Sequence, residues 1–280
     1  MVTAPELYFH AKKIFECNHI ESASFEAMCI LEHVFEKKLT ALLLEKPTAT
    51  EEQKNTVNNL AYMRISGYPL QYLLGQWEFF GLPFYVGEGV LIPRQDTETL
   101  VETVLKIKLP EKPKILDICS GSGCIAVALY LNIKNAEVTA VEISDIAVEY
   151  IKKNAKLNNA DINIVKGDAL SEKTVRIFGE MDVIVCNPPY LTADDMKTLQ
   201  KEVTFEPEAA LFGGMDGLDF YRGITKIWKN CLKSGGILAY EIGMGQENDV
   251  KKIFEENDFI NIEMTEDLSG IIRVVRGEKI

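Results

Sequence analysis

Seven short segments with the character of strands, which alternate with stretches of helical periodicity, constrain the fold of this chain more than any other feature. The segments lie at residues 114–118, 137–142, 162–166, 181–186, 236–242, 261–265 and 271–276. Strands that alternate with helices form a parallel sheet with right-handed crossovers. The sequence therefore predicts an α/β fold over this part of the chain.

The most informative motif is Asn187-Pro188-Pro189-Tyr190, which follows the apolar run 181–186 directly. Two prolines prevent further strand pairing and stiffen the backbone, so Asn187 and Tyr190 are presented at the carboxyl edge of the sheet, where open α/β folds bind ligands. The Asn187 side-chain oxygen and the Pro188 carbonyl could accept both hydrogens of a planar –NH2 group, and Tyr190 could cover its flat face. The simpler alternative is an Asx-type turn that only ends a strand.

A second motif is a glycine-rich turn between the run 114–118 and an alanine-rich helical stretch. Glycines let a ligand approach the backbone, and the new helix offers free N–H groups. Gly121, Gly123 and Ala126 satisfy the dinucleotide-binding pattern, so a nicotinamide cofactor is one alternative. Asp117 would oppose a pyrophosphate, however, and it suits an ammonium beside a carboxylate, as in the methionine part of S-adenosylmethionine. The candidate turn residues are Cys119, Ser120, Gly121, Ser122 and Gly123.

Carboxylates also end the next two strands. Glu142 is placed to accept hydrogen bonds from both hydroxyls of a ribose, and Asp168 to meet an adenine amine. Taken singly, Glu142 or Asp168 could equally be a solvated acid at the end of a strand, with no role in binding. Three successive strand ends that carry Asp117, Glu142 and Asp168 favour a site for S-adenosylmethionine.

These residues resemble the Rossmann-like S-adenosylmethionine-dependent methyltransferases that modify planar –NH2 nitrogens. Further motifs are similar, in order and spacing, to the HemK/PrmC family, the protein-(glutamine-N5) methyltransferases of peptide chain release factors. The resemblance runs from about residue 60 to the carboxyl terminus. The motifs that carry it, besides those above, are Tyr72 to Gly75, Glu78 to Leu82, Val90 to Arg94 with Thr97 and Glu98, Phe205 to Pro207, Gly213 to Leu218, Phe220 to Arg222 and Glu241 to Gly243.

The change from short helical stripes to alternating strands and helices predicts a separable helical substrate-recognition domain at 1–75 and a β-hairpin linker at 76–93, and the resemblance implies a class I methyltransferase domain at 94–280. It also implies that the last strand is inserted antiparallel and that S-adenosylmethionine is the cofactor, bound in part by Ala169 and Asn187. The implied reaction is methylation of the glutamine in the Gly-Gly-Gln motif of a release factor. Asn187, Pro188, Pro189 and Tyr190 would bind that glutamine, and no metal or covalent nucleophile is needed. The sequence does not identify a residue that would act as the base for the amide proton.

The segments before residue 94 carry their own signals. Apolar residues at helical spacing over 25–39 predict a helix, and Thr50 followed by Gln53 is a capping box that starts a helix running to Ile65. Strands are expected at 79–86 and 90–92, around a turn at 87–89.

The chain departs from the family pattern at several positions. Cys119-Ser120 replace Gly-Thr in the cofactor turn, and because Cys119 has a side chain the turn is expected to avoid strongly positive φ there. Glu142 replaces Asp with the same acceptor role. Ala169 stands where an aromatic often flanks the adenine, so stacking on that side is not expected. Ile272 replaces a frequent Asp, and Gln95-Asp96 replace Pro-Glu, which affects detail of the linker and not the fold.

The net charge of the chain distinguishes between protein and nucleic-acid substrates. The 30 Lys and Arg against 42 Asp and Glu give a net charge of −12, and basic residues occur only in short pairs. Nucleic-acid binding relies on clustered basic residues, so no direct nucleic-acid contact is expected, and a basic protein partner is favoured. Release factors and ribosomal proteins are both basic partners of this kind, so a ribosomal-protein glutamine methyltransferase is one alternative. A nucleobase amino-group methyltransferase is a second alternative, which the acidic charge disfavours. A cytoplasmic monomer with free thiols, no metal and no membrane segment is expected.

Overall fold

The computed structural model describes residues 1–280 and divides into two compact units. The first unit is Met1–Gly75 with Gln200–Phe205, and the second is Gln76–Leu199 with Glu206–Ile280. The segment 200–205 lies inside the range that the sequence assigned to the methyltransferase domain, but its contacts group it with the first unit. No helix has the length and apolar character needed to span a membrane. All six cysteines are unpaired, as expected.

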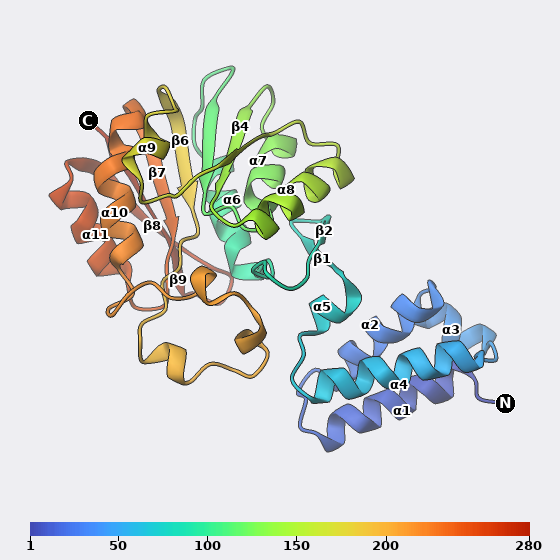
Figure 1. Ribbon diagram of the computed structural model, residues 1–280. Coiled ribbons are helices and arrows are strands. Elements are labelled where there is room, and N and C mark those ends of the chain that lie inside the picture. The colour runs from blue at the N-terminus through green and yellow to red at the C-terminus, as the bar shows by residue number, and fades with distance from the viewer. The chain divides into compact units, whose positions relative to one another are not determined.

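Five helices form the first unit, shown in blue and cyan in Figure 1: α1 (Ala4–Cys17), α2 (Ala23–Phe35), α3 (Leu39–Glu45), α4 (Glu51–Ile65) and α5 (Leu70–Leu74). The predicted capping box is present, since Thr50 Oγ1 accepts from Gln53 N at 3.1 Å and Gln53 Oε1 accepts from Thr50 N at 3.0 Å. The helix expected over 25–39 ends at Phe35 instead, because Glu36 adopts a left-handed conformation with φ 51°. Leu39 then begins a separate helix.

A buried ion pair ties the first unit together. The guanidinium of Arg64 in α4 contacts Glu26 of α2 at 2.6 Å and Glu202 at 2.8 Å, and both Arg64 and Glu26 are buried. Hydrogen-bonded pairing of this kind is what allows a charge to be buried. The pair therefore fixes α2, α4 and the segment 200–205 to one another.

A short hairpin opens the second unit, and its position differs from the prediction. Its strands are β1 (Gln76–Phe79) and β2 (Leu82–Tyr85), joined by a two-residue turn at Phe80 and Gly81, which have φ of 53° and 72°. Two positive φ values are typical of the type I′ turn that matches strand twist. The expected turn at 87–89 is present, since Val90 N donates to Gly87 O at 3.3 Å, but residues 90–92 form no strand. The expected strand over 79–86 is instead interrupted at Phe80 and Gly81, because Phe80 is an unusual residue for such a turn and gave no signal.

The central sheet has seven strands in the order β5-β4-β3-β6-β7-β9-β8. Neighbouring strands from β5 to β7 pair in parallel, and β9 is inserted antiparallel between β7 and β8, as the resemblance implied. The strands are β3 (Lys114–Ile118), β4 (Glu137–Glu142), β5 (Asn163–Lys166), β6 (Met181–Cys186), β7 (Leu232–Glu241), β8 (Phe259–Glu266) and β9 (Ile272–Lys279).

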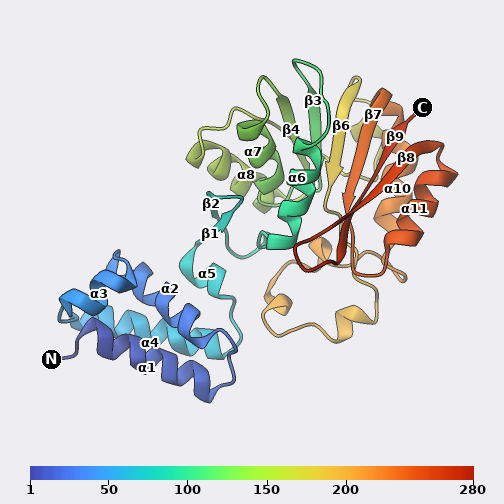
Figure 2. The ribbon, with the colours of Figure 1, turned by 180° about the vertical axis from the view of Figure 1, so that it is seen from behind.

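Helices cover both faces of this sheet (Figure 2). One core contains residues of α6 (Glu98–Leu105), α7 (Cys124–Asn132) and α8 (Asp145–Leu157), and the other contains residues of α9 (Glu172–Val175), α10 (Asp219–Trp228) and α11 (Glu247–Glu256). Alternate strand residues enter opposite cores, as with Val185 in the first core and Cys186 in the second. The helices leave the carboxyl ends of β3, β4 and β6 free to build a site.

Candidate active site

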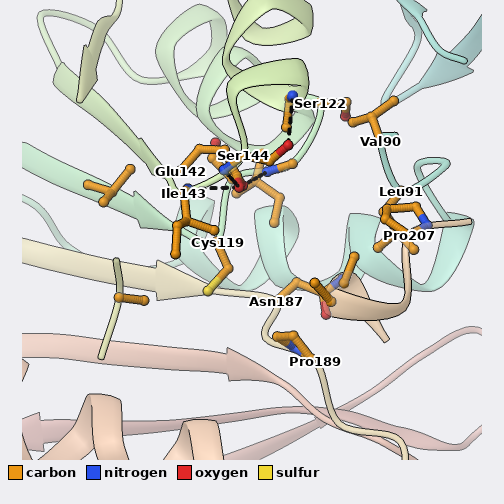
Figure 3. A pocket seen from close by; sticks show the side chains of 18 of the residues that line it. Val90, Leu91, Cys119, Ser122, Glu142, Ile143, Ser144, Asn187, Pro189 and Pro207 are labelled. Carbon is orange, nitrogen blue, oxygen red and sulfur yellow. Dashed lines mark hydrogen bonds between the residues drawn. The ribbon is translucent and has the colours of Figure 1, made fainter. Parts of the chain in front are cut away.

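A cavity of about 300 Å³ lies at the carboxyl ends of β3, β4, β5 and β6 (Figure 3). Most of the residues that the sequence nominated line it together: Cys119, Ser120, Gly121, Ser122, Glu142, Asp168, Ala169, Asn187 and Pro189. Asp117, Gly123, Pro188 and Tyr190 are not on its wall. The fold therefore brings the two motifs to one cavity, but it gives four of the nominated residues other positions.

Cys119 contradicts the expectation for its backbone. Its φ is 59°, in the left-handed region, although a residue with a side chain was expected to avoid that region. The strain costs about 1–2 kcal/mol for an L-residue, and the neighbouring contacts hold it: Ser120 N donates to Val141 O at 3.2 Å, and Gly123 N donates to Ser120 O at 2.8 Å. The Cys119 side chain consequently lies on the cavity wall (Figure 3).

Asp117 lies beneath the turn and not on the cavity wall. Its Oδ2 accepts hydrogen bonds from Ser120 Oγ and, at 3.1 Å, from Ala126 N, while Oδ1 is buried without a partner. Burial raises the pKa of this carboxyl to about 7, although the hydrogen bonds from Ser120 and Ala126 act in the opposite direction. Asp117 thus links the end of β3 to the first turn of α7 and fixes the shape of the loop.

Glu142 presents a carboxylate that is held from three sides. Its Oε2 accepts from Gly121 N at 2.8 Å, and its Oε1 accepts from Ile143 N and Ser144 N at 2.8 Å each (Figure 3). Backbone donors satisfy only part of the capacity of a carboxylate, which has about four lone-pair positions. Because Glu142 also lines the cavity, its remaining capacity suits a hydroxyl donor there.

The loop after β5 forms the next part of the wall. Asp168 is exposed, and its Oδ1 accepts from Leu170 N at 2.8 Å. Ala169 is buried, and its carbonyl accepts from the indole Nε1 of Trp228 at 2.7 Å. The indole therefore anchors the backbone of this loop from the core beneath it, which leaves the small Ala169 side chain at the cavity.

The loop after β6 is held by two other loops. Asn187 is half-buried, and its Nδ2 donates to Thr97 Oγ1 at 3.3 Å. The Tyr190 carbonyl accepts from Gln246 Nε2 at 3.0 Å. At Gly213 an added Cβ would lie 2.6 Å from Pro189 O, so no side chain fits there. These contacts fix the motif at the edge of the sheet.

The rest of the wall comes from segments to which the sequence gave no role. Residues 89–94 and the segment around Pro207 form another side of the cavity, and Val90, Leu91 and Pro207 are labelled in Figure 3. Glu206 joins the two segments, since it accepts from Ile92 N at 3.0 Å and forms an ion pair with Arg94. Their only signal in the sequence was that both segments carried family motifs.

Two family models match the chain. The PrmC N-terminal domain matches residues 6–75, and the methyltransferase small domain matches residues 95–211. The release factor glutamine methyltransferase of Clostridium acetobutylicum is 40% identical over 255 residues, which are 89% of this chain and 89% of that protein. The chain belongs to the release factor glutamine methyltransferase family.

Other members of this family support the assignment. The Thermodesulfovibrio yellowstonii enzyme is 39% identical over 89% of this chain and 90% of its own length. The Fusobacterium nucleatum enzyme is 42% identical over 82% of this chain, and the match spans 65% of that longer relative.

Similarity to solved structures supports the fold. The catalytic domain of hMettl16, solved with an RNA hairpin, has a TM-score of 0.56 at 18% identity and covers 85% of this chain and 86% of that chain. A methyltransferase from Pyrococcus furiosus has a TM-score of 0.53 at 16% identity over 82% of this chain and 99% of that chain. At such low identity these neighbours identify the methyltransferase fold and nothing about the substrate.

Proposed function

We propose that this chain transfers a methyl group from S-adenosylmethionine to the side-chain amide nitrogen of a glutamine in peptide chain release factors, at the Gly-Gly-Gln motif. The observation that carries the proposal is the position of the Asn187 amide, which lines the same cavity as Gly121 and Glu142. A carboxamide beside a site for a methyl donor suits a substrate with a planar –NH2 group. The family relationship supplies the release factor as the protein that bears it.

The residues present fit S-adenosylmethionine. A Cβ added at Gly121 would meet no atom within 4 Å, so this glycine leaves open space on the cavity wall for a ligand. Glu142 keeps acceptor capacity for a ribose hydroxyl, and the cavity volume of about 300 Å³ lies in the range of small-molecule sites. When bound, the cofactor supplies a methyl group that its sulfonium already activates. The chain therefore needs no nucleophile of its own.

The task of the protein is to hold the substrate nitrogen. A glutamine amide is a poor nucleophile because its lone pair is delocalised into the carbonyl. Asn187 Oδ1 and the Pro188 carbonyl would accept its two hydrogens and fix the nitrogen about 3 Å from the reacting carbon. Two acceptors of this kind also reject a substrate that lacks those hydrogens, because they would be buried unpaired. Tyr190, one residue beyond the prolines, would cover the amide plane from outside the cavity wall.

We further propose that residues 1–75 recognise the protein substrate, that the enzyme acts as a cytoplasmic monomer, and that it makes no direct contact with nucleic acid. The net charge of −12 supports a basic protein partner.

A truncated chain that starts at Gln76 should methylate a short Gly-Gly-Gln peptide and should not methylate an intact release factor. Equal turnover of the intact factor by both chains would show that the first unit has a structural role only.

Substrate identity is tested by labelled methyl transfer in parallel reactions. Purified release factor, ribosomal proteins and nucleic acid are each incubated with the enzyme and labelled S-adenosylmethionine. The proposal requires label in the release factor at the glutamine of the motif. Label in a ribosomal protein would indicate a ribosomal-protein glutamine methyltransferase, and label in nucleic acid would indicate a nucleobase methyltransferase.

A further inference from the structure

A buried carboxyl group lies at the end of the strand next to the Asn187 motif. In the β6–β7 pair Cys186 is opposite Tyr240, so Asn187 and Glu241 occupy the adjacent ends of two neighbouring strands. The Glu241 side chain is 2% exposed, and its Oε2 is buried without a hydrogen-bond partner. Glu241 is not on the cavity wall and is not among the groups proposed to hold the substrate nitrogen.

Glu241 has polar neighbours on the side of the cavity. Burial raises the pKa of its carboxyl to about 7, and hydrogen bonds from Thr97 and Asn187 counter that rise. Thr97 is itself buried, lines the cavity, and accepts from Asn187 Nδ2 at 3.3 Å. The three side chains therefore form one polar group in which the carboxyl group is farthest from the cavity.

An ion pair does not explain why Glu241 is buried. Arg273 is the nearby cation, but it pairs with Asp96 at 2.8 Å and with Asp267 at 3.0 Å. Tyr221 donates to the backbone carbonyl of Glu241 at 3.1 Å and not to its side chain. Asp96, Tyr190, Tyr221 and Cys124 are the other titratable groups whose charge couples to this carboxyl.

When Glu241 is ionised, its carboxylate can only accept, and this fixes the direction of the hydrogen bonds. The Thr97 hydroxyl has one hydrogen, and when it donates to Glu241 its lone pairs must accept from Asn187 Nδ2. With the –NH2 half of the Asn187 amide held in this way, its Oδ1 is left for the cavity. An amide without such a neighbour can turn over and present either half.

We propose that Glu241 is a positioning residue that, directly and through Thr97, holds the Asn187 amide with Oδ1 toward the cavity, ready to accept an N–H of the substrate. This inference rests on the proposed methylation of a planar –NH2 group. It also makes Glu241 a determinant of specificity, because an inverted Asn187 amide would present donors and would favour a carboxylate in place of the glutamine amide.

Single-turnover rates on a release factor test the inference. Glu241→Gln can donate as well as accept and so no longer fixes the direction, and Thr97→Val removes the hydroxyl. Both should slow the reaction about 10- to 100-fold while cofactor affinity stays within about twofold. Thr97→Ser keeps the hydroxyl and should restore most of the rate. Thr103→Val is the matched control, because it removes a buried hydroxyl that bonds only Thr99 O, at 2.7 Å, in α6.

A readout without substrate separates this inference from the proposed function. In isotope-labelled protein, the Asn187 side-chain amide signals should shift with pH around 7 and should lose this shift in Glu241→Gln. Inactive wild-type enzyme with a titrating Asn187 signal would overturn the proposed substrate and leave the positioning role supported. Active wild-type enzyme whose rate and Asn187 signal are both unaffected by Glu241→Gln would overturn the positioning role.

Discussion

The carboxylate of Glu142 accepts the backbone N–H of Gly121 at 2.8 Å, and this bond joins the end of β4 to the glycine turn after β3. The same carboxylate also binds the N–H groups of Ile143 and Ser144. A single side chain thus orders two loops that line the cavity, and it lies on the cavity wall itself.

Replacement of Glu142 by Ala should weaken S-adenosylmethionine binding. Each charged hydrogen bond that is lost costs about 1.5–3 kcal/mol, so the dissociation constant should rise at least about tenfold. Calorimetric titration measures this. Glu137→Ala, at the exposed opposite end of β4, is the control and should bind normally. Unchanged affinity in a folded Glu142→Ala protein would refute the role of Glu142.

Gly213→Ala should disturb the loop that carries Asn187. The new Cβ would lie 2.6 Å from Pro189 O and 2.7 Å from Tyr190 Cα, and these backbone atoms must move. Overpacking of this kind costs about 1–3 kcal/mol, and we expect turnover to fall at least about tenfold with a smaller change in cofactor affinity. At Gly179 a Cβ meets nothing within 4 Å, so Gly179→Ala should behave like the parent. Equal turnover of both variants would contradict the prediction.

Glu26→Ala should destabilise the first unit. Without Glu26, the buried Arg64 keeps only Glu202 as a partner. Breaking a buried pair from one side costs about 3–5 kcal/mol, so urea unfolding of this unit should shift to clearly lower concentration. Removal of Glu149, whose pair with Lys152 is exposed, should change the free energy of unfolding by no more than about 1 kcal/mol. A similar small effect at both sites would mean that the Arg64 cluster is not stabilising.

Asp117 makes stability depend on pH. Burial raises the pKa of its carboxyl from 3.8 to about 7, so between these values the unfolded chain releases a proton that the folded protein retains. Stability must therefore fall as pH rises through this window, by on the order of 4 kcal/mol, and level off above it. Asp117→Asn should lack this contribution in denaturant titrations without ligand. Parallel stability profiles for the two proteins would contradict it.

Local patterns in the sequence were sufficient for most of the sheet. β3, β4 and β6 end at Ile118, Glu142 and Cys186, as predicted, because mainly apolar segments end there in an acid or close to a glycine or a proline pair. The predicted position of the hairpin was wrong because its turn contains Phe80 at positive φ, which no turn pattern favours. The prediction for the backbone of Cys119 was wrong for a related reason, since contacts with other residues hold a conformation that a residue with a side chain disfavours.

The site was predictable where its residues follow strands directly. Glu142 and Asn187 reached the cavity wall because the carboxyl ends of neighbouring parallel strands meet at one edge. Glu206 and Thr97 contribute through contacts with residues about 90 to 114 positions away, such as Asn187 and Ile92, which local periodicity does not encode. The same holds for the segment 200–205, which packs with the first unit.

Asn187→Ala tests the central claim most directly. This change removes the proposed acceptor for the substrate N–H and leaves Glu142 and Gly121, the proposed cofactor contacts, in place. Loss of one such hydrogen bond in a preorganised site lowers the rate by about 10²- to 10³-fold. The measurement is the single-turnover rate of methyl transfer to a release factor, with cofactor affinity determined on the same protein. We expect the rate to fall by about that factor while affinity changes much less, and a near-normal rate would show that Asn187 only ends a strand.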